Sequence, residues 1–479
     1  SNSYSGELKN VFKLQSDIAQ EIVEALKSKI TEEELVNLNS VLTENTEAYD
    51  AYLRARNIMN SSWYNYDQLM EAIGYLNNAV KLDKNFVAGW SLLSIAQSDR
   101  YGRVKEAEDD KEAKIAKAQA ELALNKTKEL QPSGFYYLRA DGYYQNIVKE
   151  DKIKAFKSLD SALEIFPNDA ETLFYLSQIY MYLGQFDDLV DTLETAYAID
   201  NQNGMVIYFL TFAYELTHRY EDMVPFLERL IKLEPENTNY LLQSKYYQFL
   251  ADGKLESFRI YENVVKKADK KVKLDNRNIV NHDMVVAMFN NDYNSYTEAW
   301  KGKWDQHHKG HGKWSCPLQI NDETNQANLM IKNGNSDLAF EIIERAKQTK
   351  EMPYNKEAFC IFNKATYNPK LEYMTGNIDL ARKQFEEIIP KILNNNSFPR
   401  GAVERSILLE TADLVAPDRV YSIYKQVTSN PVSLVSMETV CANPWIYPNL
   451  IKDPDFIKEV KEDGRFVNFL VHYNLMAKS

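Results

Sequence analysis

Three histidines and a cysteine gather in one short segment of this 479-residue sequence. His307, His308, His311 and Cys316 fall within ten residues of one another. Neutral imidazole and thiolate groups are ligands for zinc or copper, so a metal site is one interpretation. Their spacing matches no established zinc module. We therefore favour a solvated or groove-lining loop, in which the tryptophans of the same segment pack on neighbouring helices. We therefore expect no cofactor.

The elements around this segment follow a repeating helix–turn–helix pattern. Pro167, Asn201, Pro235 and Asp269 close successive phrases 34 residues apart, and Pro132 closes an earlier phrase at an interval of 35. An interval of about 34 residues is typical of tetratricopeptide (TPR) repeats. The sequence therefore predicts an all-α fold, a TPR-type α-solenoid that forms a right-handed superhelix of about eight to ten helix pairs.

The repeat pattern is regular in some parts of the chain and weak in others, and we therefore predict four parts. Residues 1–44 form N-terminal amphipathic helices, and residues 45–270 form the TPR array. Residues 271–325 are an irregular insert rich in Trp and His, and residues 326–479 hold further TPR-like helical pairs and a C-terminal cap. The regular stretch is the part in which a binding surface can be placed residue by residue.

The first helix of each TPR unit presents one face to the concave groove of the array. The groove residues that we predict are Tyr136, Arg139, Tyr143, Phe174, Gln178, Tyr208, Phe212, Glu215, Leu242, Tyr246 and Phe249. The same register adds Asn146, Glu171, Met181, Met205 and Asn239. Aromatic side chains supply a large contact area at low entropic cost, so this groove suits an extended or helical peptide.

Two features limit this prediction. TPR modules that bind a C-terminal carboxylate use several Lys, Asn and Arg residues at set positions, and here only Arg139 occupies such a position. A carboxylate clamp is therefore not expected. Two alternatives to ligand binding stay open. In the first, the aromatic residues pack within and between repeats, and in the second, a terminal segment of the chain itself fills the groove.

Composition excludes several classes of function. The net charge is −13, and the basic residues are interleaved with acids, which argues against a nucleic-acid partner. Three cysteines are too few for a disulfide framework. The longest apolar run, residues 205–214, is about half the length that a membrane span requires, so we expect no direct membrane insertion.

The first predicted helix carries one continuous apolar stripe between Leu8 and Ile30. It either caps the open end of the solenoid or packs against a partner. That partner would be an upstream domain or a second copy of the chain, which makes a homodimer through this helix one option.

The N-terminal sequence also resembles a known family. The run from Tyr4 to Ala19 resembles the phrase that closes TolB-like domains in bacterial signalling proteins, and the phrase from Glu47 to Arg56 resembles the start of the TPR array that follows there. A weaker resemblance recurs between Pro444 and Phe456. The resemblance implies an upstream fused domain, often an adenylate or guanylate cyclase, a DNA-binding domain or a kinase. It leaves open whether the module works on the cytoplasmic or the periplasmic side of a membrane-anchored parent.

These observations together predict a non-catalytic TPR scaffold that binds a protein or peptide in an aromatic concave groove. It would be the sensory or interaction half of a bacterial signalling protein. A SusD-like glycan-binding protein is the first alternative, because the segment from Trp300 to Trp314 resembles a tryptophan-bearing insert. An all-α toroidal glycosidase is the second, but no pair of acids stands out as its two catalytic carboxylates.

Overall fold

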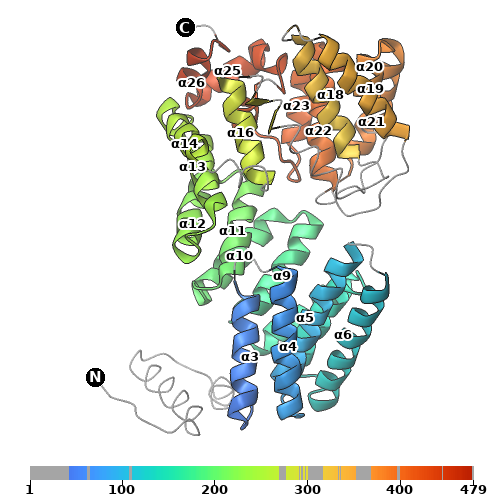
Figure 1. Cartoon of the computed structure of the whole chain (residues 1–479), viewed down its shortest axis with the longest axis vertical. Coiled ribbons are helices and arrows are strands. Elements are labelled where there is room, and N and C mark those ends of the chain that lie inside the picture. The colour runs from blue at the N-terminus through green and yellow to red at the C-terminus, as the bar shows by residue number, and fades with distance from the viewer. Residues whose placement is uncertain are drawn as a thin grey trace. The chain divides into compact units, whose positions relative to one another are not determined.

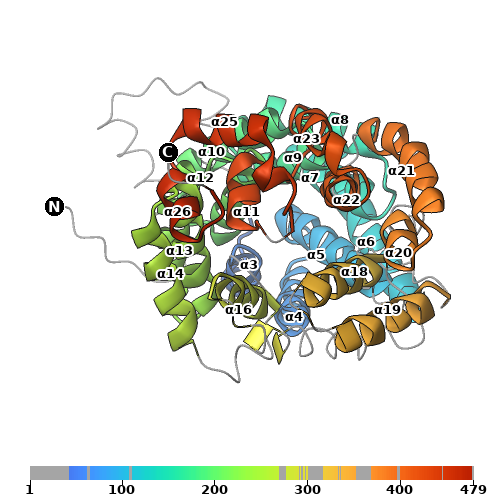
Figure 2. The same cartoon turned by 90° about the horizontal axis from the view of Figure 1, so that it is seen from above.

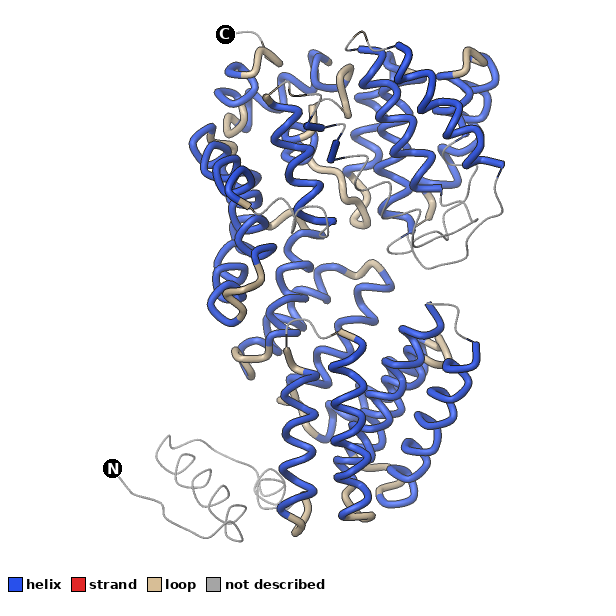
Figure 3. The backbone as a smooth tube through the Cα atoms, in the orientation of Figure 1, coloured by secondary structure: helices blue, strands red, loops and turns tan. Residues whose placement is uncertain are grey.

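The computed structural model describes residues 42–61, 65–106, 110–268, 277–290, 317–332, 336–351, 368–395, 400–444 and 446–476, with a few single positions between 292 and 334. These residues form helices and loops only, as Figure 3 shows. They contain 22 α-helices and two short 3-10 helices, which confirms the predicted all-α class. Among them, no helix is both long enough and apolar enough to cross a lipid bilayer.

The chain divides into two compact units, residues 1–176 and 177–479. The boundary falls inside a single helix, α9 (Ala170–Leu183). The first unit otherwise contains α3 (Thr46–Met59), α4 (Tyr66–Leu82), α5 (Val87–Glu106), α6 (Asp110–Leu130), α7 (Phe135–Ile147) and α8 (Lys152–Ile165), coloured blue to teal in Figure 1.

The second unit contains two groups of helix pairs and a C-terminal segment. The first group is α10 (Phe186–Ile199), α11 (Gly204–Leu216), α12 (Tyr220–Leu233), α13 (Thr238–Asp252) and α14 (Leu255–Lys267), followed by the single helix α16 (Arg277–Phe289). The second group is α18 (Pro317–Lys332), α19 (Ser336–Glu351), α20 (Asn368–Met374), α21 (Ile378–Leu393), α22 (Arg400–Val415) and α23 (Val420–Thr428), with the 3-10 helix η4 (Pro417–Arg419) between the last two. The segment ends with α24 (Met437–Ala442), η5 (Leu450–Lys452), α25 (Pro454–Asp463) and α26 (Val467–His472).

The helix boundaries repeat at the predicted interval. The first helices of four successive pairs begin at Phe135, Ala170, Gly204 and Thr238, at spacings of 35, 34 and 34 residues. Together with the consecutive pairing of the helices, this spacing confirms the TPR-type α-solenoid fold. The helix starts follow from local chemistry: the side chain of Asn203, for example, accepts hydrogen bonds from the backbone amides of Met205 and Val206 in the first turn of α11.

The turn inside each of these four pairs holds one residue in the left-handed backbone region. These residues are Glu150, Gly184, His218 and Gly253, with φ of 56°, 71°, 56° and 61°. A left-handed residue ends one helix and redirects the chain, and glycine adopts this conformation at the lowest cost. The repeat is therefore a repeat of backbone geometry even where the residue type changes.

Small residues let the paired helices approach closely. A Cβ atom on Gly142 of α7 would lie 2.5 Å from Cγ of Leu159 in α8, well inside van der Waals contact. Ala155 and Ala162 on the facing side of α8 are fully buried. Small residues thus allow the close helix contact on which the packing of this pair depends.

The C-terminal segment, residues 430–476, connects the two helix groups of the second unit. On one side, Phe466 and Phe469 pack against Phe249 of α13, with ring centroids 5.6 and 4.6 Å apart. On the other side, the carboxylate of Asp413 in α22 accepts hydrogen bonds from the backbone amides of Asn449 and Leu450. Figures 1 and 2 show α26 beside α13 and α14 in both views.

The first helix and the run from Tyr4 to Ala19 lie outside the described residues. The predicted cap or dimer helix, and the main part of the family resemblance, therefore remain predictions.

Candidate functional site

The predicted groove residues lie on the first helices of four successive pairs, and their surroundings differ from pair to pair. In the first unit, Arg139 of α7 is buried beside Glu171 of α9. Arg139 Nη1 lies 3.0 Å from Glu171 Oε2 and 3.5 Å from Asp169 Oδ2. On the other carboxylate oxygen, Glu171 accepts a hydrogen bond from Arg56 of α3. We call Arg56, Arg139, Asp169 and Glu171 the ionic cluster.

The ionic cluster ties α3 to α9, more than a hundred residues later in the sequence. The guanidinium of Arg139 also lies over the rings of Phe135 and Tyr136, 5.1 and 5.5 Å from their centroids. Although burial alone would raise the pKa of Glu171, the guanidinium groups of Arg139 and Arg56 hold it below its ordinary value. Glu171 is therefore a carboxylate at neutral pH, and the cluster is a balanced set of two cations and two anions.

This arrangement corrects part of the predicted groove. Arg139, Tyr143 and Phe174 are only 3%, 7% and 7% exposed, and Tyr143 packs on Tyr175 with ring centroids 4.7 Å apart. Arg139 is interior because it pairs with Glu171 inside the ionic cluster, and Phe174, like Tyr143, packs on Tyr175, with ring centroids 5.7 Å apart. Tyr136 is half-buried against the same cluster. In the first unit, the helix face that the register selected is largely covered.

The surface is more open in the second unit. Gln178, Tyr208, Phe212 and Glu215 are each half-buried. Gln178 belongs to the end of α9, and the other three lie along α11. We call these four residues the α11 face. It combines two aromatic rings with one amide and one carboxyl group.

Glu215 is the charged residue of the α11 face. Tyr247 of α13 donates a hydrogen bond of 2.5 Å to its Oε1 atom. Burial raises the pKa of Glu215, and the hydrogen bond from Tyr247 offsets only part of that increase. Within the described residues, no basic side chain forms a salt bridge with Glu215. The carboxyl group is thus held by a phenol alone, in surroundings that penalise its charge.

The charge of Glu215 affects the pKa of nearby phenol groups. Burial raises the pKa of Tyr208, and the nearby Glu215 carboxylate raises it further. Tyr220 stacks on Tyr247 with ring centroids 5.8 Å apart. Glu215 therefore lies in an aromatic environment whose groups remain neutral and can surround a cation with ring faces and phenol oxygens.

The predicted groove residues of α13 are packed inside the protein. Leu242 and Phe249 are 1% and 0% exposed, which corrects their predicted groove-lining role. Tyr246 packs on Tyr261 and His282, with ring centroids 5.4 and 5.5 Å apart. Phe249 is buried because the aromatic rings of the C-terminal segment cover it. At α13, the self-packing alternative describes the structure.

The metal candidates His307, His308, His311 and Cys316 lie outside the described residues, so the predicted loop and its metal alternative both remain untested. In the part of the chain that is described, no three His, Cys, Asp or Glu side chains form a group able to hold a metal ion.

Two important residues were not predicted as site residues. Arg56 lies in α3, and its contact with Glu171 joins positions 115 residues apart. Tyr247 directly follows Tyr246, which the register selected instead. The unusually high tyrosine content, 31 residues, was a signal that many phenols would need polar partners.

Comparisons with known proteins give structural matches of low similarity. No protein-family model and no curated protein sequence matches this chain. Yeast Tom70 is similar in structure, with 12% identity and a TM-score of 0.39 over 89% of this chain and 98% of that chain. A tetratricopeptide repeat protein from Parabacteroides merdae shows 10% identity and a TM-score of 0.31 over 54% of this chain and 92% of that chain. For PilF of Pseudomonas aeruginosa, the identity is 14% and the TM-score 0.31, over 42% and 88% of the two chains.

Proposed function

We propose that this protein is a non-catalytic interaction scaffold and that the α11 face binds a peptide segment of a partner protein. The face lies mainly on α11, the first helix of a TPR-type pair in the second unit. Tyr208 and Phe212 supply aromatic contact area, and Gln178 supplies an amide that can both donate and accept hydrogen bonds.

The observation that carries this proposal is the state of Glu215. A carboxyl group that is desolvated and hydrogen-bonded only to Tyr247 is costly to keep charged. A lysine or arginine side chain of a bound peptide would compensate this cost. At a separation of about 4 Å and an effective dielectric constant of about 20, the attraction is about 4 kcal/mol before desolvation of the cation is subtracted. The proposed ligand is therefore a peptide with a basic residue flanked by apolar residues.

The larger context follows from the N-terminal resemblance and is also a proposal. In this view, the chain is the sensory or interaction half of a bacterial signalling protein with a cyclase, DNA-binding or kinase domain upstream. Binding at the α11 face would change the packing of neighbouring helix pairs and so affect the fused domain. The coding sequence upstream of Ser1 tests this context directly, because an unrelated neighbouring domain would remove it.

A positional-scanning library of octapeptides tests the binding proposal. The intact chain should enrich peptides with Lys or Arg at one fixed position and aliphatic or aromatic residues beside it. The Glu215→Gln variant should lose the basic preference while keeping part of the apolar preference. The Tyr208→Ala/Phe212→Ala double variant should lose both.

The matched control is Glu221→Gln, which removes one exposed carboxylate from the start of α12. This control should enrich the same peptides as the unmodified chain. Unchanged enrichment with either the Glu215 variant or the aromatic double variant, or an absence of any sequence preference in the unmodified chain, would show that the α11 face is not the binding surface.

A further inference from the structure

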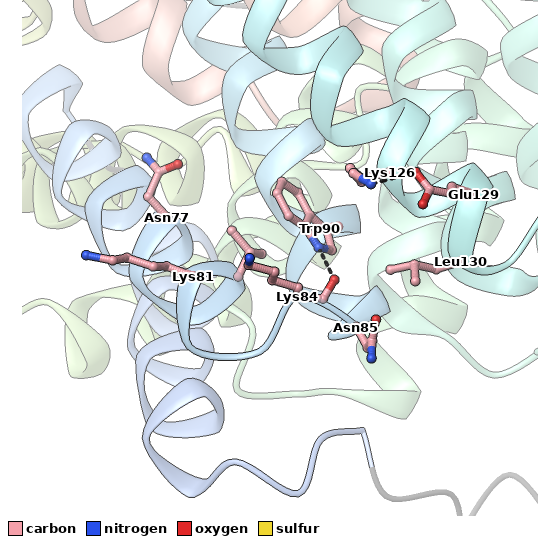
Figure 4. A pocket seen from close by; sticks show the side chains of 9 residues that line it. Asn77, Lys81, Lys84, Asn85, Trp90, Lys126, Glu129 and Leu130 are labelled. Atoms are coloured by element: carbon pink, nitrogen blue, oxygen red, sulfur yellow. Dashed lines mark hydrogen bonds and ion pairs between the residues drawn. The ribbon is translucent and has the colours of Figure 1, made fainter.

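A cavity of about 420 Å³ lies in the first unit, and no residue of the α11 face lines it. Its lining comes from the end of α4, the turn that follows, the start of α5 and the end of α6. Val80, Leu130 and the indole of Trp90 supply its apolar surface, and Lys81, Lys84 and Lys126 are the cations that line it. We call it the Trp90 pocket, and Figure 4 shows it from close by.

The position of the tryptophan ring is fixed. The indole Nε1 of Trp90 donates a hydrogen bond of 2.9 Å to the backbone carbonyl of Lys84, in the turn between α4 and α5. Trp90 is half-buried, so part of its ring lines the cavity while the rest packs against the protein. A held indole ring offers a preformed flat surface on which another ring can stack, with little entropy lost on binding.

The charge of the pocket is opposite to that of the chain. Three lysines and one glutamate line it, whereas the whole chain has a net charge of −13. Glu129 is already paired with Lys126 at 2.6 Å. Among the described residues, neither Lys81 nor Lys84 forms a salt bridge. Figure 4 shows Lys81 on one side of Trp90 and the Lys126–Glu129 pair on the other. Two positive charges therefore remain available beside a flat apolar surface.

We propose that the Trp90 pocket binds a small organic anion that carries a planar ring. The ring stacks on Trp90 against Val80 and Leu130, and the anionic group lies next to Lys81 and Lys84. The cavity volume lies in the range of small-molecule sites, roughly 300–1,000 Å³. A simple inorganic anion would leave the apolar surface uncovered, and a neutral ring would leave both lysines without a counter-charge.

This proposal does not depend on peptide binding at the α11 face. The two sites use different residues in different units, so each can fail without the other. Variants of one site should leave binding at the other unchanged, which makes each site an internal control for the other.

Fluorine NMR of the full chain provides the test, with 4-fluorobenzoate as the anionic probe and 4-fluorobenzamide as its neutral match. The benzoate should show saturable binding, weakened when salt is raised from about 0.01 M to about 0.15 M. Inorganic phosphate should compete poorly because it lacks the ring. The benzamide should bind at least about fivefold more weakly, since it forms no ion pair.

Variants then locate the site. Lys81→Gln/Lys84→Gln should weaken benzoate binding about fivefold, and Trp90→Leu about tenfold. Trp90→Phe keeps a ring and should retain part of the affinity, which separates loss of stacking from loss of folding. The control Lys111→Gln/Lys114→Gln removes two exposed lysines of α6 that do not line the pocket, and should bind normally. Equal affinity for both probes, or unchanged benzoate binding by the Trp90→Leu or the Lys81/Lys84 variant, overturns the proposal.

Discussion

Replacing Glu171 with glutamine should destabilise the first unit more than any single exposed substitution there. Glu171 connects Arg139 and Arg56, and its side chain is only 6% exposed. Glutamine has nearly the same shape, so packing is preserved while the negative charge is lost. The guanidinium of Arg139, whose side chain is 3% exposed, would then keep Asp169 as its remaining acid at 3.5 Å.

The size of the effect follows from this geometry. Removing one partner from a buried ion pair typically costs about 3–5 kcal/mol, because the other charge stays buried. Asp169 compensates part of this loss for Arg139, and Arg56 is 42% exposed and can turn to water. We therefore expect a loss of about 3 kcal/mol, at the lower end of that range. The effect should shrink in acid: the pKa of Glu171 is lowered from 4.5, so its contribution is complete above that value and is lost as pH falls through the lowered pKa.

Hydrogen exchange measured by mass spectrometry suits this test better than a global unfolding curve, because repeat arrays often unfold in parts. A loss of about 3 kcal/mol should speed exchange of the α3 and α7 amides by about a hundredfold. Glu164→Gln, at an exposed site of α8, is the control and should have no such effect. A change below about threefold in Glu171→Gln would refute the reasoning, since it would mean that the ionic cluster contributes almost nothing net.

Four further predictions concern the turns, the helix contacts and the second unit. In thermal unfolding, Gly142→Ala should lower stability by about 1–3 kcal/mol because the new Cβ atom would lie only 2.5 Å from Leu159. Gly74→Ala is the matched control, since its Cβ atom would have no neighbour within 4 Å, and it should raise stability by about 0.5–1 kcal/mol. Glu150→Gly should gain about 0.5–1 kcal/mol, because φ is 56° there. Glu215→Gln should stabilise the protein at pH 7 and make its stability less dependent on pH. The pKa of Glu215 is raised above 4.5. The stability that its protonated form contributes is therefore complete below pH 4.5 and is lost as the pH rises through the raised pKa. Asp413→Ala should speed hydrogen exchange of residues 446–452, and unchanged protection there would show that this carboxylate does not hold the C-terminal segment.

The repeating part of the fold was predictable because its signals are local. Gly142, Pro167 and Asn201 mark a helix contact and two helix ends within a few residues of where they act. The same locality shows which side chains share one helix face, so that Tyr208 and Glu215 could be grouped from spacing alone. Even so, the left-handed turn at Glu150 was not foreseen, because a glutamate gives no sequence signal for a positive φ.

Accessibility of the site could not be predicted in the same way. Phe249 is covered by Phe466 and Phe469, and Arg139 is enclosed by the approach of Arg56. The Phe249–Phe466 contact and the Arg56–Glu171 contact each join residues more than a hundred positions apart, and the helical period contains no information about such pairs. The register predicts which side chains share a face, whereas tertiary packing decides which parts of that face meet solvent.

The C-terminal segment also has a consequence for how the protein is made. Arg465 donates a hydrogen bond to the backbone carbonyl of Ala251, 214 residues earlier in the chain. At a synthesis rate of 5–20 residues per second, the ribosome needs roughly 10 to 40 s to add that length. During this time, the aromatic side of α13 is complete but uncovered. The nascent chain therefore passes through a stage in which this aromatic surface is exposed to other proteins in the cell, until Phe466 and Phe469 are added and cover Phe249.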